Sequence, residues 1–208
     1  MSLTMKYKVR RFKSLKVAIK ELEPFIRNGA HLQTGKPLKQ FGGLRSRELL
    51  ANWLLCVVSN FANKTDQMTF TSDPLGGDGI ICDSMMGKTW PMEHILVPTA
   101  HSSKAEIETL ILNAIAIKQN KGGTPYASGK TLVVFLNAGG GEWFPNKVAK
   151  NLPDNLYFES VWVVCLQSEK IGAYIYGVTL LDLSQGNTPI WLVRIGKYFN
   201  SWDVDKVQ

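Results

Sequence analysis

The sequence predicts an α/β protein in which helices flank one mixed sheet. Two observations lead to this fold class. The expected elements follow one another as helix, three strands, helix and strand, which places three consecutive strands before a crossover helix. The run Thr131–Leu136 is apolar without interruption, as expected of a strand that is covered on both faces of a sheet. Further strand-like runs follow it, so we expect the sheet to continue toward the C-terminus.

The composition is typical of a globular cytoplasmic protein. Of the 208 residues, 45% are apolar and 20% are charged, which is ordinary for a folded chain. No apolar run approaches the roughly 20 residues that a membrane helix needs, so no membrane partner is expected. The N-terminus is charged throughout and lacks an apolar signal core, and the three cysteines form no Cys-x-x-Cys pair. A reducing, cytoplasmic location is therefore expected.

The positive charge is concentrated in the front part of the chain. Residues 1–50 hold twelve Lys or Arg and three Glu, which gives +9, and residues 51–208 hold twelve Lys or Arg and fourteen acids, which gives −2. This pattern suits a polyanion partner, although a solvated cationic helix that aids solubility gives the same pattern. We expect a basic N-terminal helix and connector over 1–43 and a single α/β domain over 44–208.

The first half of the chain predicts two helices and a short strand. Lys6–Arg27 has the pattern of a basic amphipathic helix, with Pro24 breaking or kinking it near its end. Ala30–Gly43 contains turn residues and is expected to connect this helix to the next. Ser46–Asn60 is the clearest helix, because its leucines and valines recur at helical spacing. The β-branched residues of Met68–Ser72 indicate a strand.

The second half predicts a crossover helix that is followed by strands. The helix is expected over Ser103–Lys121, because Ser103-Lys104-Ala105-Glu106 matches a capping box and Gly122-Gly123 is a good C-terminal stop. The elements expected after it are the strand Thr131–Leu136, a short helix over Asn146–Asn151, the strands Ser160–Gln167, Ala173–Leu183 and Pro189–Ile195, and a docked tail over Tyr198–Gln208.

Between these halves the sequence predicts a hairpin that brings two carboxylates together. Its strands are expected at Asp78–Asp83 and Thr89–Val97, with a turn at Ser84–Gly87. In the register that this turn sets, Asp78 faces Glu93, and directly opposed Cβ atoms lie roughly 5 Å apart. Carboxylates this close repel each other unless a divalent cation or a shared proton offsets the repulsion. The alternative is that Asp78 forms a turn and Glu93 is a solvated strand residue.

The order of elements over Leu44–Gln167, with these two acids in its second and third strands, resembles the restriction-endonuclease-like fold of the PD-(D/E)XK nuclease superfamily. The resemblance implies an α-β-β-β-α-β core with a mixed sheet flanked by helices, followed here by extra C-terminal strands. Asp78 matches the metal-binding Asp of the superfamily, Glu93 matches its (D/E)XK acid, and Glu48 falls where many members carry an auxiliary acid. In such enzymes the carboxylates hold one or two Mg²⁺ (or Mn²⁺) ions, which activate water and stabilise charge on the scissile phosphate.

The sequence departs from the pattern of the superfamily at its lysine, which should follow two residues after the acid. That position is Ile95, and His94 is expected on the opposite face of the strand. Some members move the lysine to the following helix. Lys118 is the candidate, because it continues the buried stripe of that helix three residues after Ile115. At a helix end, Lys118 could instead extend its ammonium into water.

The resemblance implies a metal-dependent nuclease. Asp78, Glu93 and Lys118 would act in catalysis, and Asp78, Glu93 and Glu48 would bind the metal. The basic front half would hold the backbone of a nucleic acid, with DNA favoured over RNA, and the dimers common in the superfamily leave a homodimer open. Two alternatives stay open. One is a catalytically inactive protein of the same fold that serves as a binding module, as the missing lysine at Ile95 suggests. The other is a generic α/β protein whose acids form turns.

Two other patterns do not indicate a function. Ser128-Gly129-Lys130-Thr131 ends like a phosphate-binding loop, but Thr124 stands where the first glycine is needed, and a helix precedes the segment where a strand should. His94 and His101 could join Glu93 in a zinc site, but no further ligand pair has the standard spacing.

Overall fold

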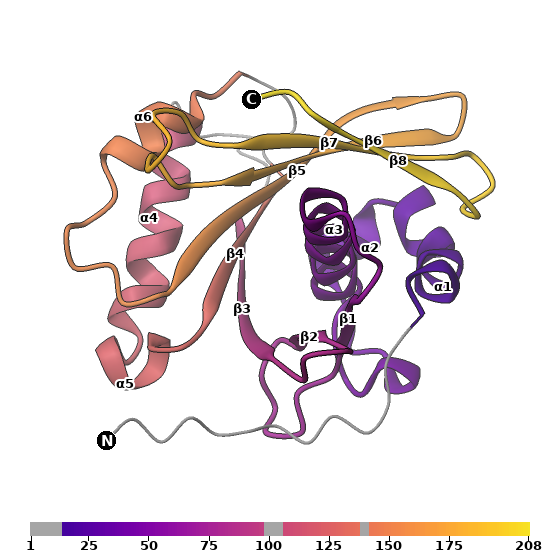
Figure 1. Cartoon of the computed structure of the whole chain (residues 1–208), viewed down its shortest axis with the longest axis horizontal. Helices are drawn as coiled ribbons and strands as arrows, with labels where there is room; N and C mark the ends of the chain where they lie inside the picture. The colour runs from indigo at the N-terminus through magenta and orange to yellow at the C-terminus, as the bar shows by residue number, and fades with distance from the viewer. Residues whose placement is uncertain (1–13, 98–105, 138–141) are drawn as a thin grey trace.

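The structure is a computed structural model that describes residues 14–97, 106–137 and 142–208 (Figure 1). Its helices are α1 (Leu15–Arg27), α2 (Ala30–Thr34), the 3₁₀ turn η1 (Lys39–Phe41), α3 (Ser46–Asn63), α4 (Ile107–Asn120), α5 (Gly123–Ala127) and α6 (Pro145–Lys150). Its strands are β1 (Met68–Thr71), β2 (Ile80–Asp83), β3 (Thr89–Val97), β4 (Thr131–Leu136), β5 (Ser160–Lys170), β6 (Ala173–Leu180), β7 (Ile190–Ile195) and β8 (Trp202–Lys206).

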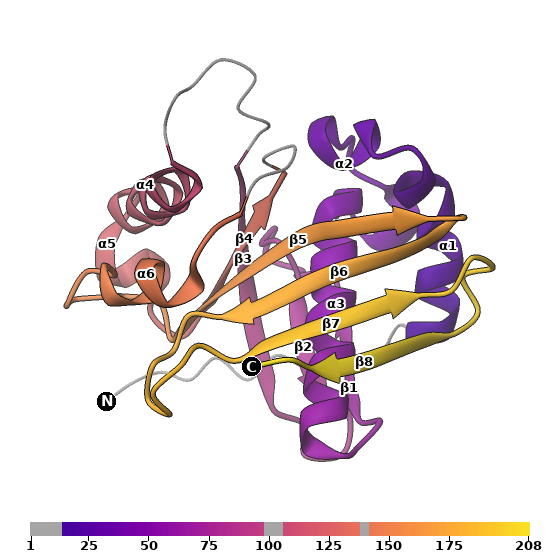
Figure 2. The ribbon, with the colours of Figure 1, turned by 90° about the horizontal axis from the view of Figure 1, so that it is seen from above.

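The strands of the described residues form one mixed sheet of eight strands in the order β1 to β8. Neighbouring strands are antiparallel except for β3 with β4 and β4 with β5, which are parallel. The crossover from β3 to β4 contains α4 and α5. Figure 2 shows β5 to β8 side by side at the C-terminal end of the sheet. The predicted α/β class, with a mixed sheet and extra C-terminal strands, is confirmed.

Helices cover both faces of the curled sheet. α3 lies inside the curl with α1 and α2 beside it, and α4 lies against the opposite face with α5 and α6 nearby (Figure 1). Each side has its own apolar cluster: one joins α1 and α3 to the inner face, and the other joins α4 and α6 to the outer face. Because successive strand residues point to opposite faces, β3 and β4 contribute to both clusters.

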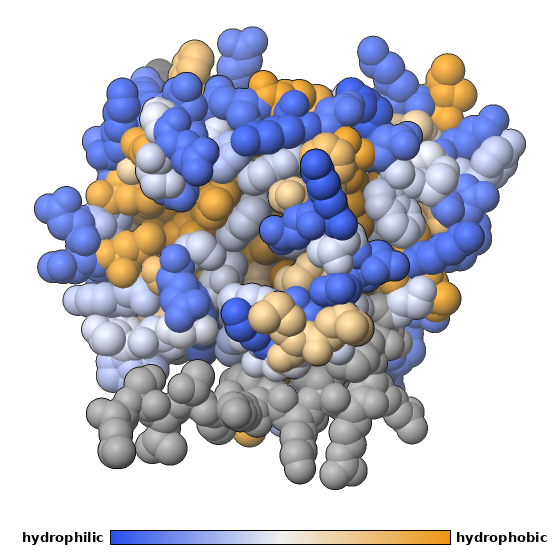
Figure 3. Space-filling view, viewed as in Figure 1, coloured by the Kyte–Doolittle hydropathy of each residue, from blue (hydrophilic) through white to orange (hydrophobic). Residues whose placement is uncertain are grey.

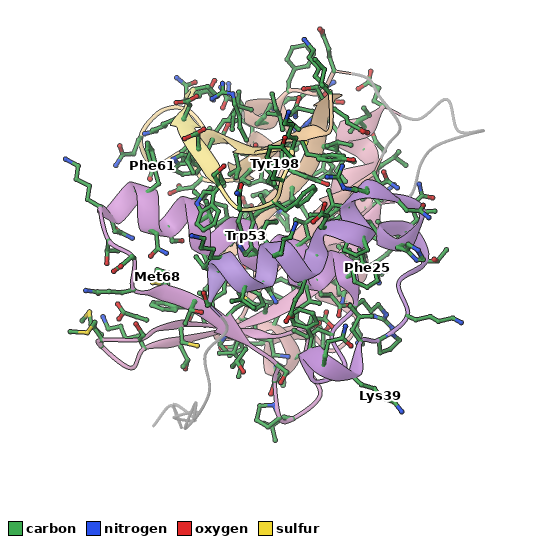
Figure 4. The ribbon with its side chains drawn as sticks, turned by 90° about the vertical axis from the view of Figure 1, so that its right-hand side faces the viewer. Phe25, Lys39, Trp53, Phe61, Met68 and Tyr198 are labelled. Atoms are coloured by element: carbon green, nitrogen blue, oxygen red, sulfur yellow. The ribbon has the colours of Figure 1, made fainter. Side chains whose placement is uncertain are left out.

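α3 is the centre of the inner cluster. Leu50, Trp53 and Leu54 have no exposed surface, and Nε1 of Trp53 donates a hydrogen bond of 2.8 Å to the carbonyl of Leu15 at the start of α1. Figure 4 shows α1 running alongside α3 near Trp53. The buried residues of α1 belong to the same cluster: Ala18, Ile19, Leu22 and Ile26. The described part of the basic N-terminal region is therefore packed into the core of the rest of the chain.

Two element ends differ from the prediction for physical reasons. α1 continues through Pro24 to its end, because Pro24 lies in the last turn and Ile26 beyond it is buried. β2 begins at Ile80 rather than at Asp78, because Gly79 has a φ of +114°, which interrupts the extended backbone.

Two further differences concern α4 and its surroundings. The chain turns after α4 and forms the short helix α5. This helix was not expected, because Gly122-Gly123 is typical of a helix end. α4 begins at Ile107. The first three residues of the expected capping box lie outside the described residues. So do His101 and residues 6–13 of the expected first helix.

α4 leaves apolar side chains at the surface. Ile117 is 65% exposed. On the face shown in Figure 3, apolar residues gather over the region of this helix. Among the described residues, none of the helices combines the length and apolar character that a membrane crossing needs.

Candidate functional site

The hairpin of β2 and β3 has the predicted register. Ile80 pairs with Pro91, and in the next step the amide of Met92 donates a hydrogen bond of 2.9 Å to the carbonyl of Gly79. Continued by one residue, this register puts Asp78 opposite Glu93. Asp78 itself lies in the loop before β2, where its side chain is about one-fifth exposed (22%).

Glu93 is the centre of a cluster of cationic and hydroxyl groups. Its Oε2 accepts a hydrogen bond of 3.0 Å from Nζ of Lys118 and another from the hydroxyl of Tyr126. Its Oε1 accepts a hydrogen bond of 3.0 Å from Nζ of Lys130. The side chain of Glu93 is 9% exposed. Both carboxylate oxygens are thus bound by donors in a largely buried place, which is where charge-assisted hydrogen bonds are strongest.

Lys118 links the two acids. Its Nζ lies 3.0 Å from Oε2 of Glu93 and 3.9 Å from Oδ2 of Asp78, and its side chain is 14% exposed. The ammonium therefore does not extend into water but lies between two carboxylates. Of the alternative, the turn position of Asp78 agrees with the structure, whereas Glu93 is not a solvated strand residue.

Helix α4 and the start of β4 bring these two lysines to Glu93. In α4, Ile111 and Ile115 are buried, and Lys118 follows on the same stripe, three residues after Ile115. Lys130 lies two residues before Leu132, which pairs with Glu93 across the parallel β3–β4 ladder. Residues two apart in an extended chain share a face, so Lys130 and Glu93 project to the same side.

A second network fixes the loop that carries Asp78. The amide of His94 donates a hydrogen bond of 2.7 Å to Oδ2 of Asp78, and Nδ2 of Asn52 in α3 donates one of 3.1 Å to the Asp78 carbonyl. Oδ1 of Asn52 lies 3.0 Å from Nε2 of His94. A Cβ on Gly79 would lie 2.4 Å from Nδ2 of Asn52, so this loop position requires glycine. Asn52 thus joins the loop to β3 from the inner side of the sheet.

The two carboxyl groups have pKa values shifted in opposite directions. Burial alone would raise the pKa of Glu93, but the hydrogen bonds from Tyr126, Lys118 and Lys130 outweigh it and lower this pKa to about 2. Burial raises the pKa of Asp78, against the opposing effects of the His94 amide and the Lys118 charge. A pair of acids whose environments separate their pKa values is a common property of catalytic sites.

Tyr126 and His94 stay neutral near pH 7. Burial, followed by the hydrogen bond to Glu93, raises the pKa of the Tyr126 hydroxyl. Burial lowers the pKa of His94 to about 4, and its Nδ1 has no hydrogen-bond partner among the described residues. His94 points to the inner face of the sheet, as predicted, and serves the Asn52 network there.

Glu48 is used at the start of α3. Its Oε2 accepts a hydrogen bond of 2.8 Å from the Arg45 amide, and its Oε1 accepts one of 2.9 Å from the Arg45 guanidinium. An acid in this first turn satisfies a free amide and complements the helix dipole. Within the described ranges, no three His, Cys, Asp or Glu side chains converge on one metal position. The structure thus brings Asp78, Glu93 and Lys118 together, and it gives Glu48 a capping contact.

Three residues of the site were not identified from the sequence: Asn52, Tyr126 and Lys130. Lys130 had been considered only as part of a phosphate-loop motif. The signal that could have identified it is its place directly before the apolar run of β4 and two residues before Leu132, once that strand is placed beside β3. Asn52 could have been noticed as a polar residue on the buried stripe of α3. Tyr126 lies in α5, a helix that no pattern in the sequence predicts.

The site carries more positive than negative groups. The ammonium of Lys121 lies 4.8 Å and that of Lys130 4.5 Å from the centre of the Tyr126 ring, within cation–π range. Lys118 and Lys130 pair with the acids Asp78 and Glu93, and Lys121 adds a third lysine beside Tyr126. In comparisons with protein-family models, with curated proteins and with solved structures, nothing matched this chain.

Proposed function

We propose that this protein is a metal-dependent phosphodiesterase that acts on nucleic acid, with its lysine supplied by α4. One observation carries the proposal: the Lys118 ammonium lies between the carboxylates of Asp78 and Glu93, at 3.9 and 3.0 Å. A largely buried lysine is stable only with such partners, and its position is suited to hold a phosphate oxygen or an attacking water.

The arrangement of elements supports the resemblance to the restriction-endonuclease-like fold. α3, β1, β2, β3, α4 and β4 follow in the expected order, with antiparallel pairs up to β3 and a parallel β4. Asp78 precedes β2, Glu93 lies in β3, and Ile95 replaces the usual lysine. A lysine that reaches Glu93 from α4 compensates for this replacement.

The two carboxylates suit a hard divalent cation such as Mg²⁺ or Mn²⁺, because such ions prefer oxygen ligands. Lys118 interacts with both acids, so the two carboxylates can hold a single positive charge between them. Asp78 and Glu93 would hold the ion, which when bound activates water and stabilises charge on the phosphate. Glu48 would contribute from further away, since Arg45 already holds both of its oxygens.

The remaining residues of the site orient the two acids or neutralise negative charge. Lys130 and Tyr126 keep Glu93 ionised and fix its carboxylate plane through separate oxygens. The Asn52–His94 network aims the Asp78 carboxylate at Lys118. Lys121 lies at the exposed side of the cluster, where it can meet the phosphate backbone.

The test is hydrolysis of single- and double-stranded DNA and RNA by the purified chain with Mg²⁺, Mn²⁺ or EDTA. We expect cutting that needs the metal, is abolished in Asp78→Asn and falls about 100-fold or more in Lys118→Met. The matched control is Lys147→Met, which removes an exposed lysine whose partner is Glu106. Cutting that survives in the Asp78→Ala/Glu93→Ala double variant would exclude these residues from the reaction.

A second candidate is a binding module of the same fold without catalysis. It is favoured by the charge balance, because Lys118 and Lys130 already neutralise Asp78 and Glu93 without a metal. Calorimetric titration separates the candidates. Heat from millimolar Mg²⁺ or Mn²⁺ that disappears in Asp78→Asn supports the enzyme, and its absence with both ions supports the module.

A further inference from the structure

We propose that a pocket on the inner face of the sheet receives one unstacked base of a single-stranded nucleic acid. The pocket has a volume of about 680 Å³, within the range of sites that enclose a small ligand. It lies on the α3 side, whereas the Glu93 cluster lies on the α4 side. The choice of a nucleic-acid strand as its ligand rests on the proposed function, but the pocket itself does not.

The floor of the pocket offers hydroxyl groups to the edge of a base. Thr131 of β4 and Ser160 of β5 are neighbours in the parallel ladder, and their hydroxyl oxygens lie 3.1 Å apart. Each hydroxyl has one donor and two acceptor positions, so the pair can still bind a ligand while bonded to each other. A base edge carries both donors and acceptors, which matches this floor.

The walls offer aromatic surface for stacking. Trp90 of β3 and Trp162 of β5 both line the pocket and are partly exposed. The Trp162 ring is stacked on Trp191 with a centroid distance of 5.7 Å and an interplanar angle of 30°, which fixes its orientation. Bases stack on such rings regardless of their sequence, which is the usual mode of single-strand binding.

The mouth of the pocket carries lysines for the adjacent phosphates. Lys64, which follows α3, and Lys88, which lies in the hairpin turn, are exposed lining residues. The acid of the lining, Asp83, is occupied by the turn, because its Oδ1 accepts the amides of Met85 and Met86 at 2.9 and 2.8 Å. With Lys64 and Lys88 against this one carboxylate, the mouth is net positive, as phosphates require.

The pocket and the Glu93 cluster meet at the same end of the sheet. Met92 lines the pocket while its neighbour Glu93 faces the cluster, and Thr131 lines the pocket while Lys130 contacts Glu93. A strand that crosses the amino end of β4, beside the middle of β3, can therefore contact both. On its other side the pocket shares residues, Met68 among them, with a larger groove of about 1750 Å³ along β8. Figure 4 labels Met68 and Phe61, which also lines this groove.

The experiment is fluorescence anisotropy of a labelled 12-nucleotide single strand with the full chain in EDTA, so that cutting does not affect the readout. We expect Trp90→Leu to raise the Kd roughly 5- to 100-fold. Trp90→Phe, which keeps an aromatic ring, should stay within about threefold of the wild type. Lys88→Met should weaken binding and reduce the salt slope by about one. Lys147→Met, on the exposed surface of α6, should change nothing.

Three results would overturn the proposal. They are equal affinity for a strand whose bases are replaced by abasic positions, equal affinity for a single mononucleotide, or an unchanged Kd in a folded Trp90→Leu. If Trp90→Leu unfolds, the exposed Lys88→Met variant and the abasic strand still test whether the pocket binds a base. Base-dependent binding without metal-dependent cutting would refute only the proposed enzyme. Cutting with base-independent binding would refute only the pocket.

Discussion

Replacing Glu93 by glutamine should remove an acid-sensitive part of the stability of the fold. The pKa of Glu93 is lowered from 4.5 to about 2. Each pKa unit corresponds to about 1.4 kcal/mol, so the full shift is worth about 3 kcal/mol. Because Lys130 is 29% exposed and water screens its charge, we expect about 2 kcal/mol of this to be measurable.

The direction of the pKa shift of Glu93 determines how the stability of the fold changes with pH. The folded state binds the proton less readily than the unfolded state, so Glu93 stabilises the fold above pH 4.5 and loses this effect as the pH falls toward 2. Urea unfolding of wild type and Glu93→Gln at pH 7, 5, 4 and 3 should show a difference of about 2 kcal/mol at pH 7 that shrinks to about half by pH 3.

The control is Glu106→Gln, which removes an exposed acid that also pairs with a lysine. It should leave the pH dependence close to that of the wild type. If wild type and Glu93→Gln lose stability in parallel between pH 5 and pH 3, Glu93 is not held ionised by Lys118, Lys130 and Tyr126. The reading of this cluster as a set of matched charges would then be wrong.

Three further predictions concern the same region. Lys118→Met should lower the free energy of unfolding by about 2–4 kcal/mol, because it leaves the two acids together. Mg²⁺ should raise the Tm of this variant more than that of the wild type, and an equal rise in both would contradict the prediction. Gly79→Ala should cost at least about 1–3 kcal/mol in urea unfolding, because of its φ of +114° and its contact with Asn52, whereas Gly29→Ala, which meets no atom within 4 Å, should be close to neutral. His94→Gln should lose less stability than the wild type between pH 6.5 and pH 4, because the pKa of His94 is lowered to about 4 and only the unfolded state takes up its proton there; parallel curves from urea unfolding would contradict this.

Local rules were sufficient to predict the register that brings the two acids together. The register that sets Asp78 against Glu93 depends only on turn length and the two-residue period of strands, and both are properties of a short segment. For Lys118, the resemblance implied a lysine in the helix after β3, and the 3.6-residue period of α4 then selected Lys118 as the residue on its buried stripe.

The rest of the cluster depends on tertiary structure. Lys130 reaches Glu93 only through the parallel register of β3 and β4, which a helix crossover separates in the sequence. Tyr126 requires α5, a short helix that begins at Gly123, the second of the two glycines expected to end the preceding helix. For Glu48, the resemblance implied a metal ligand, whereas its place in the first turn of α3 indicated a contact with the helix end. The structure shows the contact with the helix end.

If Lys118 acts on a phosphate as proposed, the second lysine, Lys130, would keep the site stable. With Asp78 and Glu93 ionised, the two acids balance Lys118 and Lys130. If an incoming phosphate attracts Lys118, Lys130 and Tyr126 still hold Glu93, and one negative charge becomes unbalanced near Asp78. Affinity for a divalent cation should therefore rise when nucleic acid is bound. A site with a single lysine would lack this coupling, because the release of that lysine would leave both acids buried without a cation.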